Sequence, residues 1–183
     1  MKTITLLLTI LLGSISLAQT NLEYVYFSGA LDPKIALFGT DNEYTTHGTG
    51  IDYLGKFGLR FKNTEAVGYI ESYEDIGYRA IGLQYSYVLP YKKFDFLAGL
   101  ETSIISRYEI VDRNPDGSIL NDRWMEYYPS FGVNLETRWN ITRHLAIGWV
   151  ANWKTRPDIA VIGRVSTYAT LYIKIPTKNR YDR

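Results

Sequence analysis

The amino-acid sequence predicts an all-β protein, a closed antiparallel up-and-down transmembrane β-barrel of about eight strands. Three observations predict it. Polar and apolar residues alternate with a period of two over long segments, short and long connections alternate along the chain, and the apolar faces are rich in aromatic residues. In a strand, such alternation sends the two sets of side chains to opposite sides of the sheet. The chain contains 16 Tyr, 7 Phe and 4 Trp, and a barrel with aromatic girdles at both membrane interfaces accommodates them.

Residues 1–18 have the pattern of a secretory signal peptide. Lys2 precedes an apolar run over residues 4–12, and Ser16-Leu17-Ala18 supplies the small residues that a cleavage site needs. The run is shorter than the roughly 20 residues of a membrane-spanning helix. A buried N-terminal helix or strand is the alternative. We expect a mature chain that begins at Gln19, a barrel domain over residues 19–176 and a polar tail over residues 177–183.

Six segments show clear alternation and are predicted to be strands: residues 51–61, 78–89, 94–110, 125–141, 144–156 and 164–175. An even barrel needs two more strands. The weaker alternation of residues 65–74 gives one of them, with Tyr69 and Glu71 assigned to the inside. The other is predicted over residues 22–30, with Leu22, Tyr24 and Tyr26 outward, and residues 35–40 compete for this place.

The connections between these segments differ in length. Short turns occur at residues 62–64, 90–93 and 140–143, and they alternate with longer connections at about residues 31–47, 75–77, 111–123 and 156–161. Outer-membrane barrels have short periplasmic turns and longer extracellular loops. Loops on a rigid scaffold often carry recognition, so loops 31–47 and 111–123 are expected to meet any extracellular partner.

The composition of the two faces predicts which one points into the barrel. Eight strands enclose a narrow interior, and the aromatic residues of the apolar faces are too bulky to fill it. The polar faces contain glycines, which need little space, together with charged residues that persist inside only when they are paired. We therefore predict an apolar face toward lipid and a charge network in the lumen, formed by Asp52, Lys56, Arg60, Glu101, Arg107, Glu136, Arg138, Lys154 and Arg164. A soluble β-barrel is the alternative.

The chain resembles the small outer-membrane barrels of the OmpA transmembrane-domain and OmpX type over about residues 22–175. The resemblance rests on the export signal, the strand lengths, the inside-out alternation and the turn asymmetry, and on no specific motif. It implies a location in the cell outer membrane, in contact with outer-membrane lipid, and no cofactor. One departure concerns the end of the chain, because the last strand stops near Pro176 and a polar tail follows.

One local motif resembles a metal site. Residues 112–119 match the start of a calcium loop, with oxygen ligands at Asp112, Asn114 and Asp116 and a glycine at the sixth position. The glutamate expected at the twelfth position is replaced by Arg123. The competing interpretation is a type I turn over residues 114–117, which have proline and glycine where such a turn prefers them.

The remaining composition limits the function classes. The chain has no cysteine and a net charge of +1, so it offers neither thiol chemistry nor an electrostatic case for nucleic acid. His47 and His144 are the only histidines, and neither has a recognisable serine and acid beside it, as a lipid A-modifying enzyme would need. The expected function is therefore non-enzymatic, structural or loop-mediated. The alternatives are a narrow pore, a lipid A-modifying enzyme and a soluble periplasmic ligand-binding barrel.

Overall fold

The computed structural model describes residues 22–33, 52–73, 78–115, 119–124, 127–156 and 161–177. Nine strands account for most of them: β1 (Leu22–Leu31), β2 (Tyr53–Phe61), β3 (Thr64–Tyr73), β4 (Tyr78–Tyr91), β5 (Phe94–Arg113), β6 (Ile119–Trp124), β7 (Tyr128–Asn140), β8 (Leu145–Arg156) and β9 (Val161–Pro176). Among the described residues, no helix has the length and apolar character to cross a membrane.

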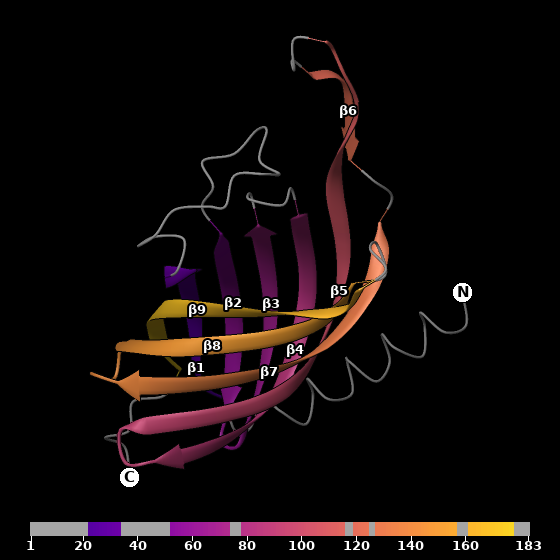
Figure 1. The fold of residues 1–183 in the computed structure, drawn as a ribbon. Helices are drawn as coiled ribbons and strands as arrows, with labels where there is room; N and C mark the ends of the chain where they lie inside the picture. Colours follow the sequence, from indigo (N-terminus) through magenta and orange to yellow (C-terminus); the bar gives the residue numbers. More distant parts are fainter. Residues whose placement is uncertain are drawn as a thin grey trace.

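Eight of these strands form one closed antiparallel barrel (Figure 1). Each pairs with the next along the chain, in the order β1, β2, β3, β4, β5, β7, β8 and β9, and β9 returns to pair with β1. The closing pair runs from Tyr24 opposite Pro176 to Leu31 opposite Ala169. Because β1 and β9 satisfy each other, neither is left as an open edge of the sheet. The predicted eight-stranded up-and-down barrel is confirmed.

The strands are strongly staggered around the barrel. Tyr26 pairs directly with Lys174 on β9. The same row of paired residues can also be followed from Tyr26 in the other direction, through β2 and the remaining strands to β9. It then reaches β9 at Arg164, which is ten positions before Lys174. The residues along this path are Gly58, Val67, Gln84, Glu101, Gly132 and Lys154. Stagger, tilt and strand number together set the width of a barrel. With eight strands the interior is narrow enough for side chains to fill.

The apolar side chains point outward and the charged side chains point into the barrel. Trp149 is 48% exposed and Phe131 is 63% exposed, whereas Arg138 is 0% and Glu101 is 5% exposed. A soluble barrel would have the reverse arrangement, with its apolar face inside. The faces predicted for β2, β4, β5, β7, β8 and β9 are therefore confirmed.

The first strand has the opposite orientation to the predicted one. Tyr26, which alternation predicts on the outer face, is fully buried inside the barrel, with Tyr24 packed beside it, while Phe27 is 53% exposed. Both faces of this segment carry large apolar or aromatic residues, so alternation alone does not determine which face is inside. The register with β2 decides it, because Tyr26 pairs with Gly58, whose face also carries the inward Lys56 and Arg60.

The third strand has the predicted orientation, since Tyr69 and Glu71 are both buried in the interior. The competing first strand at residues 35–40 and the expected signal peptide at residues 1–18 lie outside the described residues.

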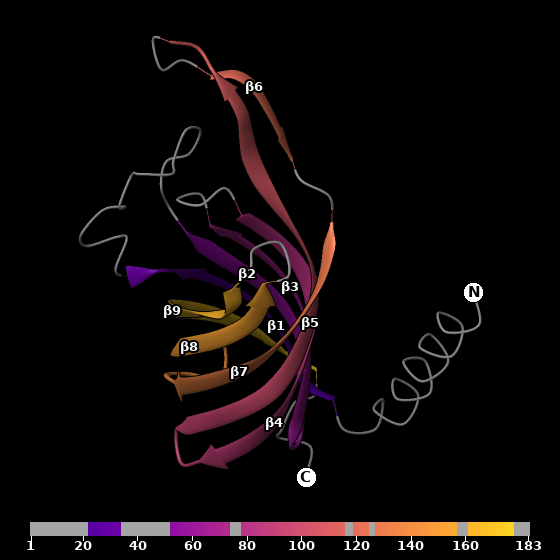
Figure 2. The ribbon, with the colours of Figure 1, turned by 45° about the vertical axis from the view of Figure 1, so that its right-hand side comes forward.

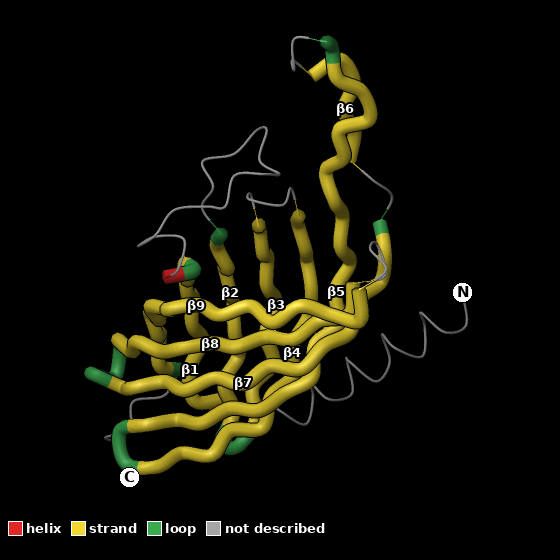
Figure 3. The backbone as a smooth tube through the Cα atoms, viewed as in Figure 1, coloured by secondary structure: helices red, strands yellow, loops and turns green. Residues whose placement is uncertain are grey.

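A two-stranded extension replaces the predicted loop at residues 111–123. β5 continues to Arg113, and β6 pairs back onto it from Trp124 opposite Tyr108 to Ile119 opposite Arg113. The hairpin projects beyond the other strands (Figures 2 and 3). Its physical basis is visible in the sequence: residues 110–111 and 119–120 are apolar or β-branched, which favours strands, and the turn-forming Asn114-Pro115 lies between them.

The three short turns lie at one end of the barrel, which we call the turn end; the opposite end is the loop end. Each turn accepts a backbone hydrogen bond from a neighbouring strand, so the rim is fixed: Val88 N–H to Asn63 O at 2.8 Å, Asn140 N–H to Lys93 O at 2.7 Å and Lys174 N–H to His144 O at 2.8 Å. Where the barrel closes, the N–H of Thr177 donates to the carbonyl of Glu23 at 3.1 Å.

Candidate functional site

Four charged side chains from three strands meet in the barrel interior, and we call them the central cluster: Lys56, Glu65, Glu136 and Arg138. Arg138 forms a two-pronged contact with Glu65, with Nη1 donating to Oε2 at 2.9 Å and Nη2 to Oε1 at 3.0 Å. Its Nε donates to Glu136 Oε1 at 2.8 Å, and Lys56 Nζ donates to Glu136 Oε2 at 3.0 Å. Two acids face two bases, which is the condition for keeping charges in a buried site.

Tyrosine rings surround the guanidinium of the central cluster. Its central carbon lies 4.8 Å from the ring centre of Tyr26 and 4.2 Å from that of Tyr172. Such contacts attract a cation to the face of the ring. Tyr26 also donates from its hydroxyl to Glu65 at 2.5 Å, and Nη1 of Arg138 donates to the hydroxyl of Tyr24 at 3.4 Å. Packing and hydrogen bonding thus fix Arg138 in one position.

A second group of charges lies nearer the loop end, and we call it the loop-side cluster. Lys154 contacts the carboxylate of Glu71 and lies 3.5 Å from Oε1 of Glu101. Its ammonium lies 4.4 Å from the ring centre of Tyr69. The hydroxyl of Tyr168 donates to Glu71 Oε1 at 2.6 Å. One lysine therefore connects two carboxylates from different strands.

A third group lies at the turn end of the interior. Arg60 Nη2 is 3.8 Å from Asp95 Oδ1, and Asn140 donates to Asp95 Oδ2 at 3.0 Å. Lys174 Nζ donates to Asn140 Oδ1 at 2.9 Å. Together with the central and loop-side clusters, this turn-side cluster extends the charged and polar groups along the interior as far as the rim.

Glycines make room for the interior tyrosines. A Cβ placed on Gly58 would lie 2.1 Å from Cε1 of the Tyr26 ring, and one on Gly82 would lie 2.6 Å from Cζ of the Tyr69 ring. Both distances are shorter than any real contact of this kind. In each case the tyrosine pairs with the glycine on the adjacent strand, so the ring lies over the space that a side chain would take.

Apolar side chains pack between the charged groups. One buried cluster contains Ala30, Leu54, Tyr69, Ala80, Ile105, Val150 and Tyr168. It includes the two tyrosines that contact the loop-side cluster. In the described part of the chain, the interior is therefore a packed core of alternating ionic and apolar groups.

Seven of the predicted lumen residues lie inside and are at most 5% exposed: Asp52, Lys56, Arg60, Glu101, Glu136, Arg138 and Lys154. Arg107 and Arg164 lie in β5 and β9, but their side chains are outside the described part. Three interior residues that contact this network are absent from the predicted set: Glu65, Tyr26 and Tyr172, of which Tyr172 lies on a face that is predicted to point inward. Glu65 shares its face with Tyr69 and Glu71, so assigning the whole of that face to the interior would have found it.

The predicted calcium ligands are only partly described. Asp112 lies in β5 and Asn114 follows the strand, whereas Asp116 lies outside the described residues. Within the described ranges, no three His, Asp or Glu side chains are grouped to hold a metal ion. Calcium binding by this segment stays a prediction.

The one histidine that the structure describes, His144, does not lie in a recognisable catalytic arrangement. His144 is exposed in a short turn, where its Nε2 accepts a hydrogen bond from Arg143 Nε at 2.8 Å and its Nδ1 lies 3.2 Å from the carbonyl of Lys174. His47 lies outside the described residues.

Comparison with solved structures shows the kind of fold. The barrel is similar to the crystal structure of Neisserial surface protein A (NspA), with a TM-score of 0.51 and 11% sequence identity. The match covers 83% of this chain and 96% of that chain. At this identity the likeness shows the fold alone. No protein-family model and no curated protein sequence matches the chain.

Proposed function

We propose that this chain is a non-enzymatic integral protein of the outer membrane, of the same kind as the OmpA transmembrane domain and OmpX. One observation carries the proposal: the outer wall of the closed barrel is apolar, while the charged side chains are enclosed in paired clusters. A wall of this kind is stable against acyl chains and costly against water. Closure of the sheet also gives every barrel strand a hydrogen-bonded partner on both sides, as a lipid environment requires.

The proposed orientation follows from the two ends of the barrel. β1 starts at the turn end, and residues 1–18 are expected to export the chain, so the turn end would face the periplasm. The loop end would then face outward, with residues 31–47 and the β5–β6 hairpin at residues 111–123 as the segments that meet partners. A rigid barrel that holds such segments apart is suited to recognition.

The packed interior supports an anchoring role over a pore. Arg138, Tyr26 and Tyr172 occupy the middle of the barrel in direct contact with one another. Side chains fill the interior of eight-stranded barrels in general. A lipid A-modifying enzyme is less well supported, because the described histidine, His144, contacts Arg143 and a backbone carbonyl rather than a serine and an acid.

Fractionation with a heat-modifiability assay tests the proposal. We expect the protein in the outer-membrane fraction, resistant to carbonate extraction, with a folded form that migrates differently on a gel from the boiled form. Extraction by salt or carbonate without detergent would instead favour a soluble periplasmic barrel and overturn the proposal.

A further inference from the structure

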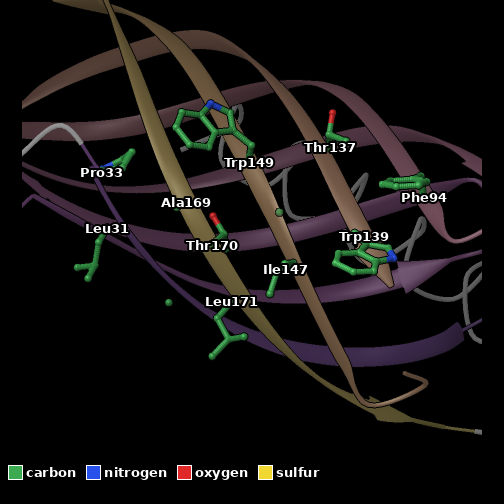
Figure 4. Close-up of a pocket in the computed structure, with 12 residues that line it drawn as sticks. Leu31, Pro33, Phe94, Thr137, Trp139, Ile147, Trp149, Ala169, Thr170 and Leu171 are labelled. Atoms are coloured by element: carbon green, nitrogen blue, oxygen red, sulfur yellow. The ribbon is translucent and has the colours of Figure 1, made fainter. Parts of the chain in front are cut away.

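The outer wall of the barrel contains a groove that crosses several strands (Figure 4). It starts at Phe94 and Trp139 at the turn end and reaches Leu31 and Pro33 at the loop end. Its lining is formed mainly by apolar side chains, and we call it the outer groove. It therefore runs diagonally across the part of the wall that we propose to be in lipid.

Small residues between large ones create the hollow. Ala169 pairs with Leu31 on one side and with Trp149 on the other, so a methyl group separates two bulky side chains. On β1, a Cβ placed on Gly29 would meet nothing within 4 Å. An extended hydrocarbon chain can lie along such an open groove, and burying it against these side chains is favourable.

Basic turns lie beside the turn end of the outer groove. Lys93 directly precedes Phe94, and its carbonyl accepts the hydrogen bond from Asn140, the residue after Trp139. Lys92 and Arg143 are exposed in the same two turns, β4–β5 and β7–β8. We call Lys92, Lys93 and Arg143 the basic turns. They place positive charge where the apolar groove meets the rim.

Lys92 adopts a backbone conformation that lysine rarely takes. Its φ is 55°, in the left-handed region where Gly, Asn and Asp are the usual residues. The hairpin turn between Tyr91 and Phe94 has only two residues, and turns of this length require a left-handed conformation. The ammonium lies 5.2 Å from the ring centre of Tyr91, within cation–π range, at the edge of the apolar wall.

The two ends of the barrel differ in charge. The short turns at residues 62–63, 92–93 and 141–144 contain three lysines, one arginine and no acid, whereas the connections at residues 34–51, 74–77 and 157–160 contain five acids and one lysine. Positive charge gathered at one membrane surface attracts anionic headgroups. The charge asymmetry therefore favours an anionic ligand at the turn end.

We propose that the outer groove and the basic turns together bind one anionic phospholipid, with an acyl chain in the groove and the phosphate against Lys92, Lys93 and Arg143. The inference rests on the proposed function, because it needs the barrel wall to be in a membrane. Long basic side chains at such a rim can keep their stems along the apolar surface while their charges reach the headgroup. Each base near an anionic surface is worth about a fivefold gain in affinity.

Fluorescence quenching by brominated lipids tests the site. Trp139 and Trp149 line the groove, so Trp124→Phe and Trp153→Phe leave two reporters there. The chain is refolded into phosphatidylcholine vesicles that contain either brominated phosphatidylglycerol or the same amount of brominated phosphatidylcholine. We expect several-fold preferential quenching by the anionic lipid. Lys92→Asn with Lys93→Gln and Arg143→Gln should bring the preference close to one, and Ala169→Phe, which fills the groove, should also reduce it.

Two matched variants separate this site from a general effect. Lys62→Gln removes a base from the same rim in the β2–β3 turn, and Val165→Phe enlarges an outward residue of β9 that does not line the groove. Both should keep the preference. An unchanged preference in the triple variant, or equal losses in the two matched variants, would overturn the site while leaving an inserted barrel. A chain that enters neither vesicle would overturn the proposed function and the site with it.

Discussion

The guanidinium of Arg138 and the carboxylate of Glu65 form two hydrogen bonds inside the barrel, at 2.9 and 3.0 Å. The two residues are 73 positions apart in the sequence and join β7 to β3, which are not neighbours in the sheet. Both side chains are 0% exposed. This buried ion pair therefore links β3 to β7 across the interior, where water does not compete for either partner.

Removing Arg138 alone should destabilise the barrel more than removing Arg138 together with Glu65. Arg138→Met leaves Glu65 and Glu136 without their shared partner, and breaking such a buried pair costs about 3–5 kcal/mol. Adding Glu65→Gln to the same chain should recover much of the loss, because Glu136 keeps its pair with Lys56 and no uncompensated charge then remains in the central cluster. Urea unfolding in lipid vesicles, followed by tryptophan fluorescence, measures both. If Arg138→Met lowered the free energy of unfolding by less than about 1 kcal/mol, the result would contradict a stabilising role for this ion pair.

Gly58 should not tolerate a methyl group. Gly58→Ala would put a Cβ 2.1 Å from the Tyr26 ring, and overpacking a filled interior typically costs about 1–3 kcal/mol. Gly68→Ala on β3 is the control, because a Cβ there meets nothing within 4 Å. The same unfolding measurement compares them. Equal stabilities of the two variants would show that the Tyr26 ring does not occupy the space over Gly58.

The sequence predicts the faces of a strand where the two faces differ in chemistry. On β7, Glu136 and Arg138 alternate with Leu135 and Trp139, and the predicted orientation is correct. On β1, the face with Tyr24 and Tyr26 is as aromatic as the face with Phe27. A tyrosine is stable inside when its hydroxyl finds a partner, which Glu65 supplies from another strand.

The sequence predicts which charged residues lie in the interior, but it does not predict which of them pair with one another. Alternation places Lys56, Glu136 and Arg138 inside, but it does not say which of them meet. Their contacts depend on the stagger of the strands around the whole barrel, and stagger follows from closure of β9 on β1. The sequence also does not distinguish the β5–β6 hairpin from a loop, because the turn-forming residues Asn114-Pro115 fit both.

A charge on the outer wall should be costly. Leu100 is 70% exposed and lies near the middle of the wall, opposite Tyr85 and Val133. Leu100→Arg should lower the free energy of unfolding in lipid by about 2–4 kcal/mol, because the cation would face hydrocarbon. Asn63→Arg, in an exposed turn, should change it little. Unfolding curves in lipid vesicles measure both free energies. Similar effects of the two substitutions would argue against a lipid-facing wall.

The intact barrel should be silent in a planar bilayer. Arg138 packs against Tyr26 and Tyr172, whose ring centres are 5.5 Å apart, so side chains fill the middle of the described interior. Tyr26→Ala with Tyr172→Ala removes both rings beside the guanidinium and should let water enter; we expect small conductance steps only in this variant. Heat-modifiability shows whether it still folds as a barrel. Steps of the same size in the unmodified protein would mean that the side chains move aside readily, and they would favour the narrow-pore alternative.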